Sequence, residues 1–100
     1  MPHTEPAPAA GRLSVQDRLD ITDLLARYCI ALDSRDWGML AGVFTEDAVA
    51  EYGRAGNPHG LPAIIRTVRS SLEPLDASQH LIGTSLIEAD GESAARGRTY

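Results

Sequence analysis

Residues 15–32 carry the pattern that most constrains the fold of this chain. Polar residues recur there at the spacing of one helix face, while nearly every other position is apolar. The polar stripe consists of Gln16, Asp20, Asp23 and Arg27. A helix that is polar along only one narrow stripe has to be covered by other elements elsewhere. The pattern therefore predicts a long central helix around which the rest of the domain packs.

The two ends of this helix carry different signals. Ser14 followed by Asp17 resembles a capping box, with Asp in place of the usual Glu. Asp33 departs from the pattern, because it projects between Ala26 and Ile30, away from the polar stripe. An ionised acid facing the interior needs a partner, since burying it alone costs on the order of several kcal/mol. The alternative is that the helix has already ended and Asp33 belongs to a turn.

The rest of the chain mixes helix and strand signals. We expect a helix over 37–44 capped by Asp36, a strand over 48–52, a glycine-rich loop over 53–60, a helix from Pro62 until Pro74 breaks it, and strands over 78–88 and 93–100 joined by an Asp90-Gly91 turn. This order predicts one α+β domain over residues 14–100, preceded by a disordered Pro/Ala-rich tail over residues 1–13. The sequence ends inside a strand pattern, which suggests that later strands of the domain are missing.

Composition narrows the class of protein. An apolar content of 43% is typical of a globular domain. The net charge is −5 and no basic cluster is present, so nucleic acids and anionic membranes are poor partners. The single cysteine, Cys29, permits no internal disulfide and fits a cytoplasmic protein. Neither a signal peptide nor an apolar run of about 20 residues is present, so no membrane span is expected.

Five motifs, taken in order, resemble those of the SnoaL-like group in the nuclear-transport-factor-two-like superfamily. They are Ile21-Thr-Asp-Leu-Leu-Ala-Arg-Tyr28, Ala31-Leu-Asp-Ser-Arg-Asp-Trp37, Val43-Phe-Thr-Glu-Asp-Ala48, Gly60 before a helix, and Gln79-His-Leu-Ile-Gly-Thr84. The resemblance spans residues 14–100. It implies a cone-shaped α+β fold, in which a curved antiparallel sheet wraps the long N-terminal helix and a ligand pocket opens at one end.

Scytalone dehydratase-type members of this group offer the nearest catalytic parallel. The resemblance implies that Asp33 matches their pocket aspartate, His80 one of two catalytic histidines, and Tyr52 one of two pocket tyrosines. Leu32 stands in place of the other tyrosine, and the second histidine would lie beyond Tyr100. We therefore expect Asp33, His80 and Tyr52 to be the catalytic residues.

Ketosteroid isomerase gives a second comparison. Tyr28 matches a helix tyrosine of that enzyme's pocket, whereas the position of its base aspartate falls at or near Tyr52. This chain therefore lacks that base. Tyr28 and Trp37 are the residues we expect to line a ligand pocket.

Each of these residues also has a structural interpretation. Asp33 would be a helix-end turn residue, and His80 a hydrogen-bonded histidine in an apolar strand. Tyr52 would pack with its hydroxyl in water, Tyr28 would be a core residue, and Trp37 is equally compatible with the core and the pocket wall. His3 and His59 are scattered and lack acids at ligand spacing, so we predict no metal site and no cofactor.

Two functional hypotheses follow. In the first, the protein is a cofactor-free lyase or isomerase, similar to a dehydratase or cyclase, acting on a small hydrophobic polyketide-, steroid- or terpenoid-like molecule. In the second, it is a non-catalytic ligand-binding or dimerisation module of the same fold, since fold alone does not fix function. Either way, we expect a homo-oligomer that forms through the sheet.

Overall fold

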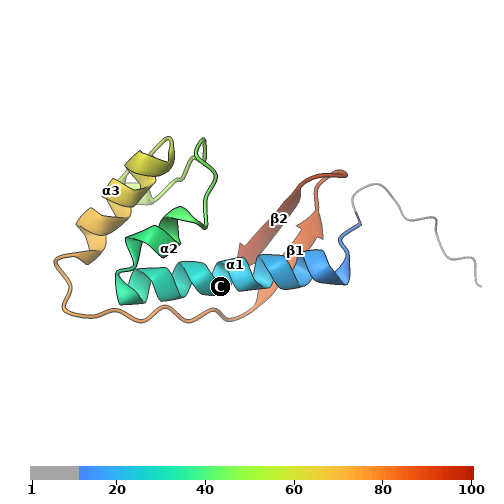
Figure 1. The fold of residues 1–100 in the computed structure, drawn as a ribbon, viewed down its shortest axis with the longest axis horizontal. Helices are drawn as coiled ribbons and strands as arrows, with labels where there is room; N and C mark the ends of the chain where they lie inside the picture. Colours follow the sequence, from blue (N-terminus) through green and yellow to red (C-terminus); the bar gives the residue numbers. More distant parts are fainter. Residues whose placement is uncertain (1–11) are drawn as a thin grey trace, which may run out of the picture. The chain divides into compact units, whose positions relative to one another are not determined.

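The computed structural model of the protein describes residues 12–100 (Figure 1). Along the chain it contains α1 (Val15–Ser34), α2 (Trp37–Ala41), the single 3-10 turn η1 (Gly53–Ala55), α3 (Leu61–Leu72), β1 (Ser85–Ala89) and β2 (Ala95–Thr99). Helices combined with a small antiparallel sheet confirm the predicted α+β class. The predicted tail over residues 1–13 lies outside the described residues, except for Arg12 and Leu13.

The chain divides into two compact units, and the division falls within α1. One unit is Asp23–Leu81, which we call the helical unit; the other combines the residues up to Thr22 with Ile82–Tyr100, and we call it the hairpin unit. The helical unit contains the rest of α1 together with α2, η1 and α3. It also contains every residue predicted to act in the site: Tyr28, Asp33, Trp37, Tyr52 and His80.

The predicted capping box is present at the start of α1. The Asp17 backbone N–H donates to Ser14 Oγ at 3.0 Å, and the Ser14 backbone N–H donates to Asp17 Oδ2 at 3.2 Å. These reciprocal bonds satisfy donors that a helix N-terminus otherwise leaves without partners. The helix extends two residues past the predicted end at Leu32, to Ser34.

The end of α1 forms a Schellman turn with an arginine in the left-handed position. Arg35 has φ +57°, its N–H donates to Leu32 O at 3.2 Å, and the Asp36 N–H donates to Ala31 O at 2.9 Å. Glycine normally occupies this position, because a side chain there costs about 1 kcal/mol. The side chain of Arg35 must therefore offset that cost through its own contacts.

The helix α2 begins as predicted and ends earlier. Asp36 caps it, accepting the Met39 N–H on Oδ1 at 3.0 Å. It ends at Ala41, not at Phe44 as predicted. Gly42, a poor helix former, provides the C-cap at that point.

The predicted strand over residues 48–52 forms only a narrow, irregular hairpin. A single bridge pairs Val49 with His59, flanked by bonds from the Ala50 N–H to Pro58 O at 3.0 Å and from the Gly60 N–H to Ala48 O at 2.7 Å. Pro58 has no N–H to donate, which limits the ladder. A regular strand here was therefore the wrong prediction.

The helix α3 begins and ends where its prolines predict. Gly60 precedes it with φ +87°, Pro62 lies in its first turn, and Leu72 ends it two residues before Pro74. Proline fits the first turn because the N–H that it lacks has no helical partner there. The start and end of α3 are thus fixed, and its apolar residues face the core.

The buried core lies at the C-terminal end of α1. Its buried members are Ala31, Leu32, Leu40, Ile64 and Val68, contributed by α1, α2 and α3. Tyr28 and Phe44 pack at its edge, with ring centroids 6.0 Å apart in an edge-to-face arrangement. Complete burial of a side chain such as Leu40 stabilises the fold by about 1.5–3 kcal/mol.

The remainder of α1 is more exposed than its sequence predicts. Val15, Leu19, Leu24 and Ile30 retain from 40% to 75% of their accessible surface. The sequence predicted that other elements would cover α1 everywhere except along its polar stripe. Within residues 12–100 they do not. In the helical unit, α2 and α3 pack on one face of the last turns of α1, which buries Ala31 and Leu32 and leaves Ile30 exposed.

The hairpin unit contains the sheet. The strands β1 and β2 pair antiparallel, with Ser85 opposite Thr99 and Ala89 opposite Ala95. The predicted turn is present, with Gly91 at φ +80°, but the connection runs from Asp90 to Ala94. The first strand begins at Ser85, later than predicted. Just before it, the Tyr100 N–H donates to Thr84 O and the Gly83 N–H donates to Tyr100 O, and these are the last bonds between the two segments.

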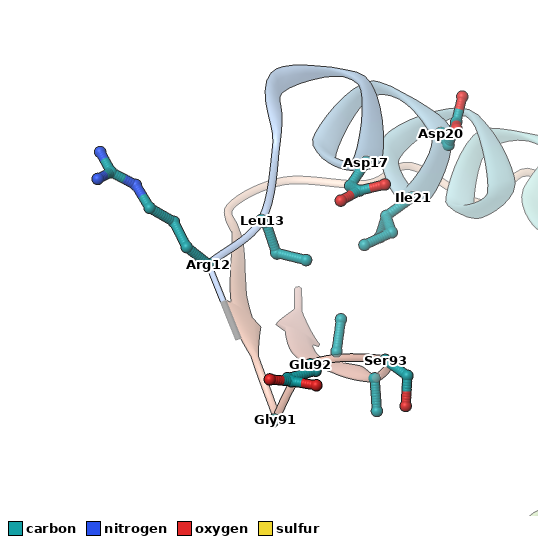
Figure 2. Close-up of a pocket in the computed structure, with 10 residues that line it drawn as sticks. Arg12, Leu13, Asp17, Asp20, Ile21, Gly91, Glu92 and Ser93 are labelled. Atoms are coloured by element: carbon teal, nitrogen blue, oxygen red, sulfur yellow. The ribbon is translucent and has the colours of Figure 1, made fainter. Parts of the chain in front are cut away.

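The hairpin unit also carries a cleft of about 320 Å³ (Figure 2). Leu13 and Ile21 point toward the loop that joins β1 to β2, whereas Arg12 extends away from it. Asp17, which also lines the cleft, is engaged in the capping box. The titratable groups in its lining are Arg12 and the carboxylates of Asp17, Asp20 and Glu92, with no histidine, cysteine or tyrosine among them. Among the described residues, no helix is both long and apolar enough to cross a membrane.

Candidate functional site

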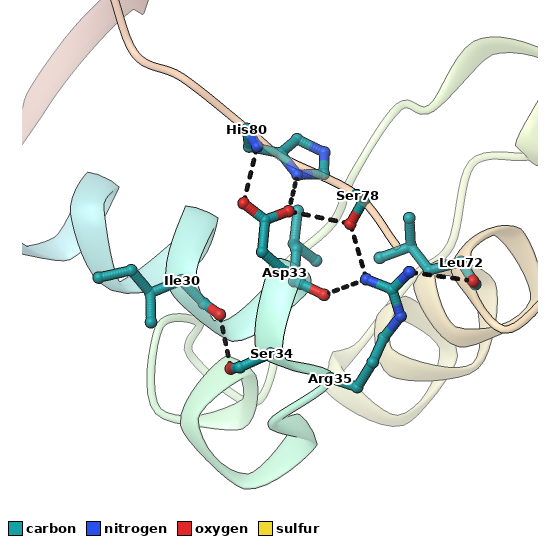
Figure 3. A network of polar contacts seen from close by, with 8 residues as sticks. Ile30, Asp33, Ser34, Arg35, Leu72, Ser78 and His80 are labelled. Carbon is teal, nitrogen blue, oxygen red and sulfur yellow. Dashed lines mark hydrogen bonds and ion pairs between the residues drawn. The ribbon is translucent and has the colours of Figure 1, made fainter. Parts of the chain in front are cut away.

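Asp33 and His80 contact each other directly in the helical unit (Figure 3). Asp33 Oδ1 lies 2.6 Å from His80 Nδ1, and Asp33 Oδ2 accepts the backbone N–H of His80 at 2.7 Å. Asp33 is the penultimate residue of α1, so a rigid helix end positions its carboxylate. His80 lies on an extended segment outside β1, not within the strand predicted for it.

This contact determines which ring nitrogen of His80 carries the hydrogen. Hydrogen bonds from the His80 backbone and ring, together with Ser78, hold the pKa of Asp33 below its ordinary value. Asp33 is therefore a carboxylate at neutral pH, and a carboxylate only accepts hydrogen bonds. Nδ1 of the neutral imidazole must then be the donor, which leaves a lone pair on Nε2.

Ser78 and Arg35 extend the network beyond the pair (Figure 3). Ser78 Oγ donates to Asp33 Oδ1 at 2.9 Å, and Arg35 Nη1 donates to Ser78 Oγ at 2.7 Å. Arg35 also donates to Leu32 O at 2.5 Å and to Leu72 O at 3.3 Å. The Asp33 carboxylate is thus connected through Ser78 to the ends of α1 and α3.

The hydroxyls of Tyr28 and Tyr52 form a second polar pair. Their oxygen atoms are 3.2 Å apart, and either can be the donor. Burial, followed by the hydrogen bond with Tyr52, raises the pKa of Tyr28. Tyr28 therefore keeps its proton across the neutral range. Because each hydroxyl has one hydrogen, the pair uses one internally and keeps the other for a neighbouring acceptor.

A cavity of about 180 Å³ is lined by His80 and by both tyrosines. Its lining combines Leu32, Val68 and Leu72 as apolar walls with polar groups at intervals. The polar lining residues are Tyr28, Tyr52, Thr67, Ser71 and His80. Ligand pockets in proteins are mostly apolar with a few placed polar groups, and this cavity fits that description at a size below the usual range of roughly 300–1,000 Å³.

Trp37, the other residue expected to line a pocket, is placed differently. It packs at the edge of the core, and the Arg69 guanidinium carbon lies 5.5 Å from its ring centroid. It does not contribute to the lining of the cavity that contains His80. Of its two interpretations, the structure favours the core.

The other titratable residues do not join the site. The side chain of His59 is exposed, and its backbone forms the bridge to Val49. Cys29 is partly exposed, and burial followed by the charge of Asp33 raises the pKa of its thiol. Within residues 12–100, no three His, Cys, Asp or Glu side chains cluster closely enough to hold a metal ion.

Sequence reasoning missed Arg35, Ser78, Thr67 and Ser71. Arg35 was visible within the Leu-Asp-Ser-Arg-Asp-Trp motif, but its bond to Ser78 joins residues that lie 43 positions apart. Thr67 and Ser71 are one turn apart on α3, and only the packing of that helix indicates that they reach the cavity. No pattern in the sequence identifies such long-range neighbours.

Comparison with known proteins assigns the family. The family model for the SnoaL-like domain matches residues 13–100. The chain therefore belongs to the SnoaL-like domain family, which confirms the predicted nuclear-transport-factor-two-like superfamily.

Individual relatives come from mycobacteria. Uncharacterized proteins of Mycobacterium bovis and of two Mycobacterium tuberculosis strains are each 33% identical to this chain over 82 residues. The aligned region covers 81% of this chain and 56% of each relative. The chain thus spans about half the length of the curated relatives it matches.

Proposed function

We propose that this domain belongs to a cofactor-free lyase or isomerase that moves protons next to the carbonyl group of a small hydrophobic molecule. The observation that carries the proposal is the 2.6 Å contact between Asp33 Oδ1 and His80 Nδ1, made by a histidine that lines an apolar cavity. An imidazole oriented by a carboxylate is suited to take and return protons near neutral pH.

His80 is the acid–base residue in this proposal. Its Nε2 lone pair removes a hydrogen from the carbon next to the carbonyl, and the electron pair of that C–H bond moves onto the carbonyl oxygen as an enolate. The resulting imidazolium is stabilised by Asp33. It then gives the proton to another carbon, which is isomerisation, or to a departing hydroxyl group, which is dehydration.

The tyrosine pair would hold the developing enolate oxygen. The hydroxyl hydrogen that is not used between Tyr28 and Tyr52 is free to donate to it. A donor of this kind acts most strongly in a site that excludes water. The apolar walls Leu32, Val68 and Leu72 favour a polyketide-, steroid- or terpenoid-like ligand.

A non-catalytic binding or dimerisation module remains the second candidate. Leu32 favours it, because it lines the cavity at the position where dehydratase-type members of the family carry a tyrosine. In that case the cavity would bind a ligand without changing it. Assembly through the sheet and a cytoplasmic location, suggested by the single cysteine, belong to the proposal in both forms.

Exchange of hydrogen for deuterium tests the proposal without knowledge of the natural substrate. The protein is incubated in D₂O with a panel of polyketide-like, steroid and terpenoid ketones, and loss of the α-hydrogen signal is followed by NMR. We expect accelerated exchange for at least one ketone. His80→Gln should lower the rate by about 100- to 10,000-fold, as loss of a general base does.

His59→Gln is the matched control, since it makes the same change at an exposed histidine outside the cavity. It should exchange the ketone at the wild-type rate. A wild-type rate in His80→Gln would contradict the assignment of the base. Ketones that bind with no exchange above buffer would instead favour the non-catalytic module.

A further inference from the structure

His80 lies on a segment with no regular secondary structure, so side-chain bonds determine its position. Residues 77–84 belong to no helix or strand. Besides the contact of the imidazole ring, two hydrogen bonds attach this segment to Asp33: Ser78 Oγ donates to Oδ1 at 2.9 Å, and the His80 backbone N–H donates to Oδ2 at 2.7 Å. The orientation of the Asp33 carboxylate therefore decides where the imidazole lies.

Arg35 fixes the direction of the bond between Ser78 and Asp33. Arg35 Nη1 lies 2.7 Å from Ser78 Oγ, and a guanidinium can only donate hydrogen bonds. The Ser78 oxygen must therefore accept from Arg35, and its own hydrogen points to Asp33 Oδ1. A hydroxyl that would otherwise rotate is held in one orientation.

Arg35 is itself held in place at two helix ends. Its guanidinium donates to the Leu32 carbonyl near the C-terminus of α1 and to the Leu72 carbonyl at the C-terminus of α3. Each of these carbonyls also accepts a backbone N–H, and the partial negative charge at a helix C-terminus stabilises a cation there. The planar fork of arginine suits this position, whereas lysine lacks the same geometry.

We propose that Arg35 and Ser78 are positioning residues, which orient Asp33 so that it holds the His80 imidazole in its Nδ1-protonated tautomer. The importance of that tautomer for turnover rests on the function proposed above, because Nε2 is then the free base. The lowered pKa of Asp33, to which the Ser78 bond contributes, supports the same arrangement.

The tautomer is measurable without any substrate. In ¹⁵N-labelled protein, long-range ¹H–¹⁵N NMR distinguishes Nδ1–H from Nε2–H at a pH where the ring is neutral. We expect Nδ1–H for His80 in the wild type and a mixture of tautomers in Ser78→Ala. Ser78→Thr restores the hydroxyl and should restore the wild-type signals.

Arg35→Gly separates the side chain from the backbone. Arg35 has φ +57°, which glycine adopts without strain, so the turn after α1 is kept while the guanidinium is removed. We expect the mixed tautomers of Ser78→Ala in this variant, although the thermal unfolding midpoint stays close to the wild-type value. Ser70→Ala and Arg66→Lys, at exposed positions on α3, are the matched controls and should leave the ring signals unchanged.

Exchange kinetics provide the second readout. Loss of a hydrogen bond to a charged group should lower the maximal rate of ketone exchange by about tenfold to a hundredfold in Ser78→Ala and Arg35→Gly, with unchanged apparent ketone affinity. Wild-type ring signals in both variants, or an Nε2–H tautomer in the wild type, would overturn the inference while leaving any exchange activity standing. Ring signals that respond as expected in a protein without exchange activity would uphold the positioning role and reject the proposed function.

Discussion

At the scale of single residues, Asp33 makes the contacts on which the site depends. It accepts from Ser78 and His80 on one carboxylate oxygen and from the His80 backbone on the other. Its side chain nevertheless keeps 25% of its accessible surface. Water therefore screens the charge, and the pair contributes little to the stability of the fold.

The lowered pKa of Asp33 predicts how stability depends on pH. Since the pKa is lower in the folded state, the stabilising contribution is present above the ordinary value of 3.8 and is lost as pH falls below it. Asp33→Asn should therefore show a smaller decrease in unfolding free energy than the wild type between about pH 5 and about pH 3. Urea denaturation at a series of pH values measures this decrease.

Asp36→Asn is the matched control for that measurement at neutral pH. It removes an acid at the same helix junction, but asparagine caps a helix about as well as aspartate, so stability should change by less than about 0.5 kcal/mol. An equal pH dependence in the wild type and Asp33→Asn would show that another group causes the acid destabilisation.

Part of the site was predictable at this scale. Asp33 interrupts an apolar helix face, so the sequence alone offered two alternatives: a partner for its charge, or a turn after the end of the helix. The helix continues to Ser34, and Asp33 has a partner. The identity of that partner as His80 came from family resemblance, because the 47 positions between them leave no local signal. Arg35 and Ser78 escaped notice because a polar residue beside a turn or loop is ordinarily in contact with water.

At the scale of elements, local chemistry explains which predictions were correct. The start of α1 follows from capping by Ser14 and Asp17, and the two ends of α3 follow from Pro62 and Pro74, all of which act within a turn of the helix. The strand over 48–52 was wrong because pairing depends on the partner, and Pro58 gives that partner no N–H. The residue pattern of one segment predicts the structure of that segment better than it predicts how the segment pairs with another.

Two glycines predict opposite effects of the same substitution. Gly60 precedes α3 with φ +87° and ψ 153°, a conformation that strains any other residue by about 1–3 kcal/mol. Gly38 lies within α2, and an added Cβ would meet only Asp36 Oδ1 at an ordinary 3.6 Å. Gly60→Ala should therefore destabilise the protein, whereas Gly38→Ala should stabilise it by up to about 1 kcal/mol.

Urea denaturation measures both changes. Because both variants add the same methyl group, their difference isolates the backbone conformation from the size of the side chain. If Gly60→Ala unfolded at the same urea concentration as Gly38→Ala, the positive φ at Gly60 would not be required for folding.

At the scale of the whole molecule, the buried residues among those that the structure describes are confined to one of its two units. Ala31, Leu32, Leu40, Ile64 and Val68 all belong to the helical unit. The strands β1 and β2 contain no buried residue and form a two-stranded sheet. A hairpin of this kind is marginally stable by itself, because burial of apolar surface is the main source of stability.

Amide hydrogen exchange should therefore differ between the two units. Residues near Ile64 and Val68 in α3 can exchange only by opening the core, whereas residues 85–99 can exchange by local opening of the hairpin. Mass spectrometry of peptic fragments should find exchange in 85–99 faster than in 61–72 by at least about tenfold, a difference of about 1.4 kcal/mol in opening free energy. The core variant Leu40→Ala should remove about 2–5 kcal/mol of stability and so accelerate exchange in α3. Equal protection of both segments in the wild type would mean that the hairpin and the core open as one cooperative structure.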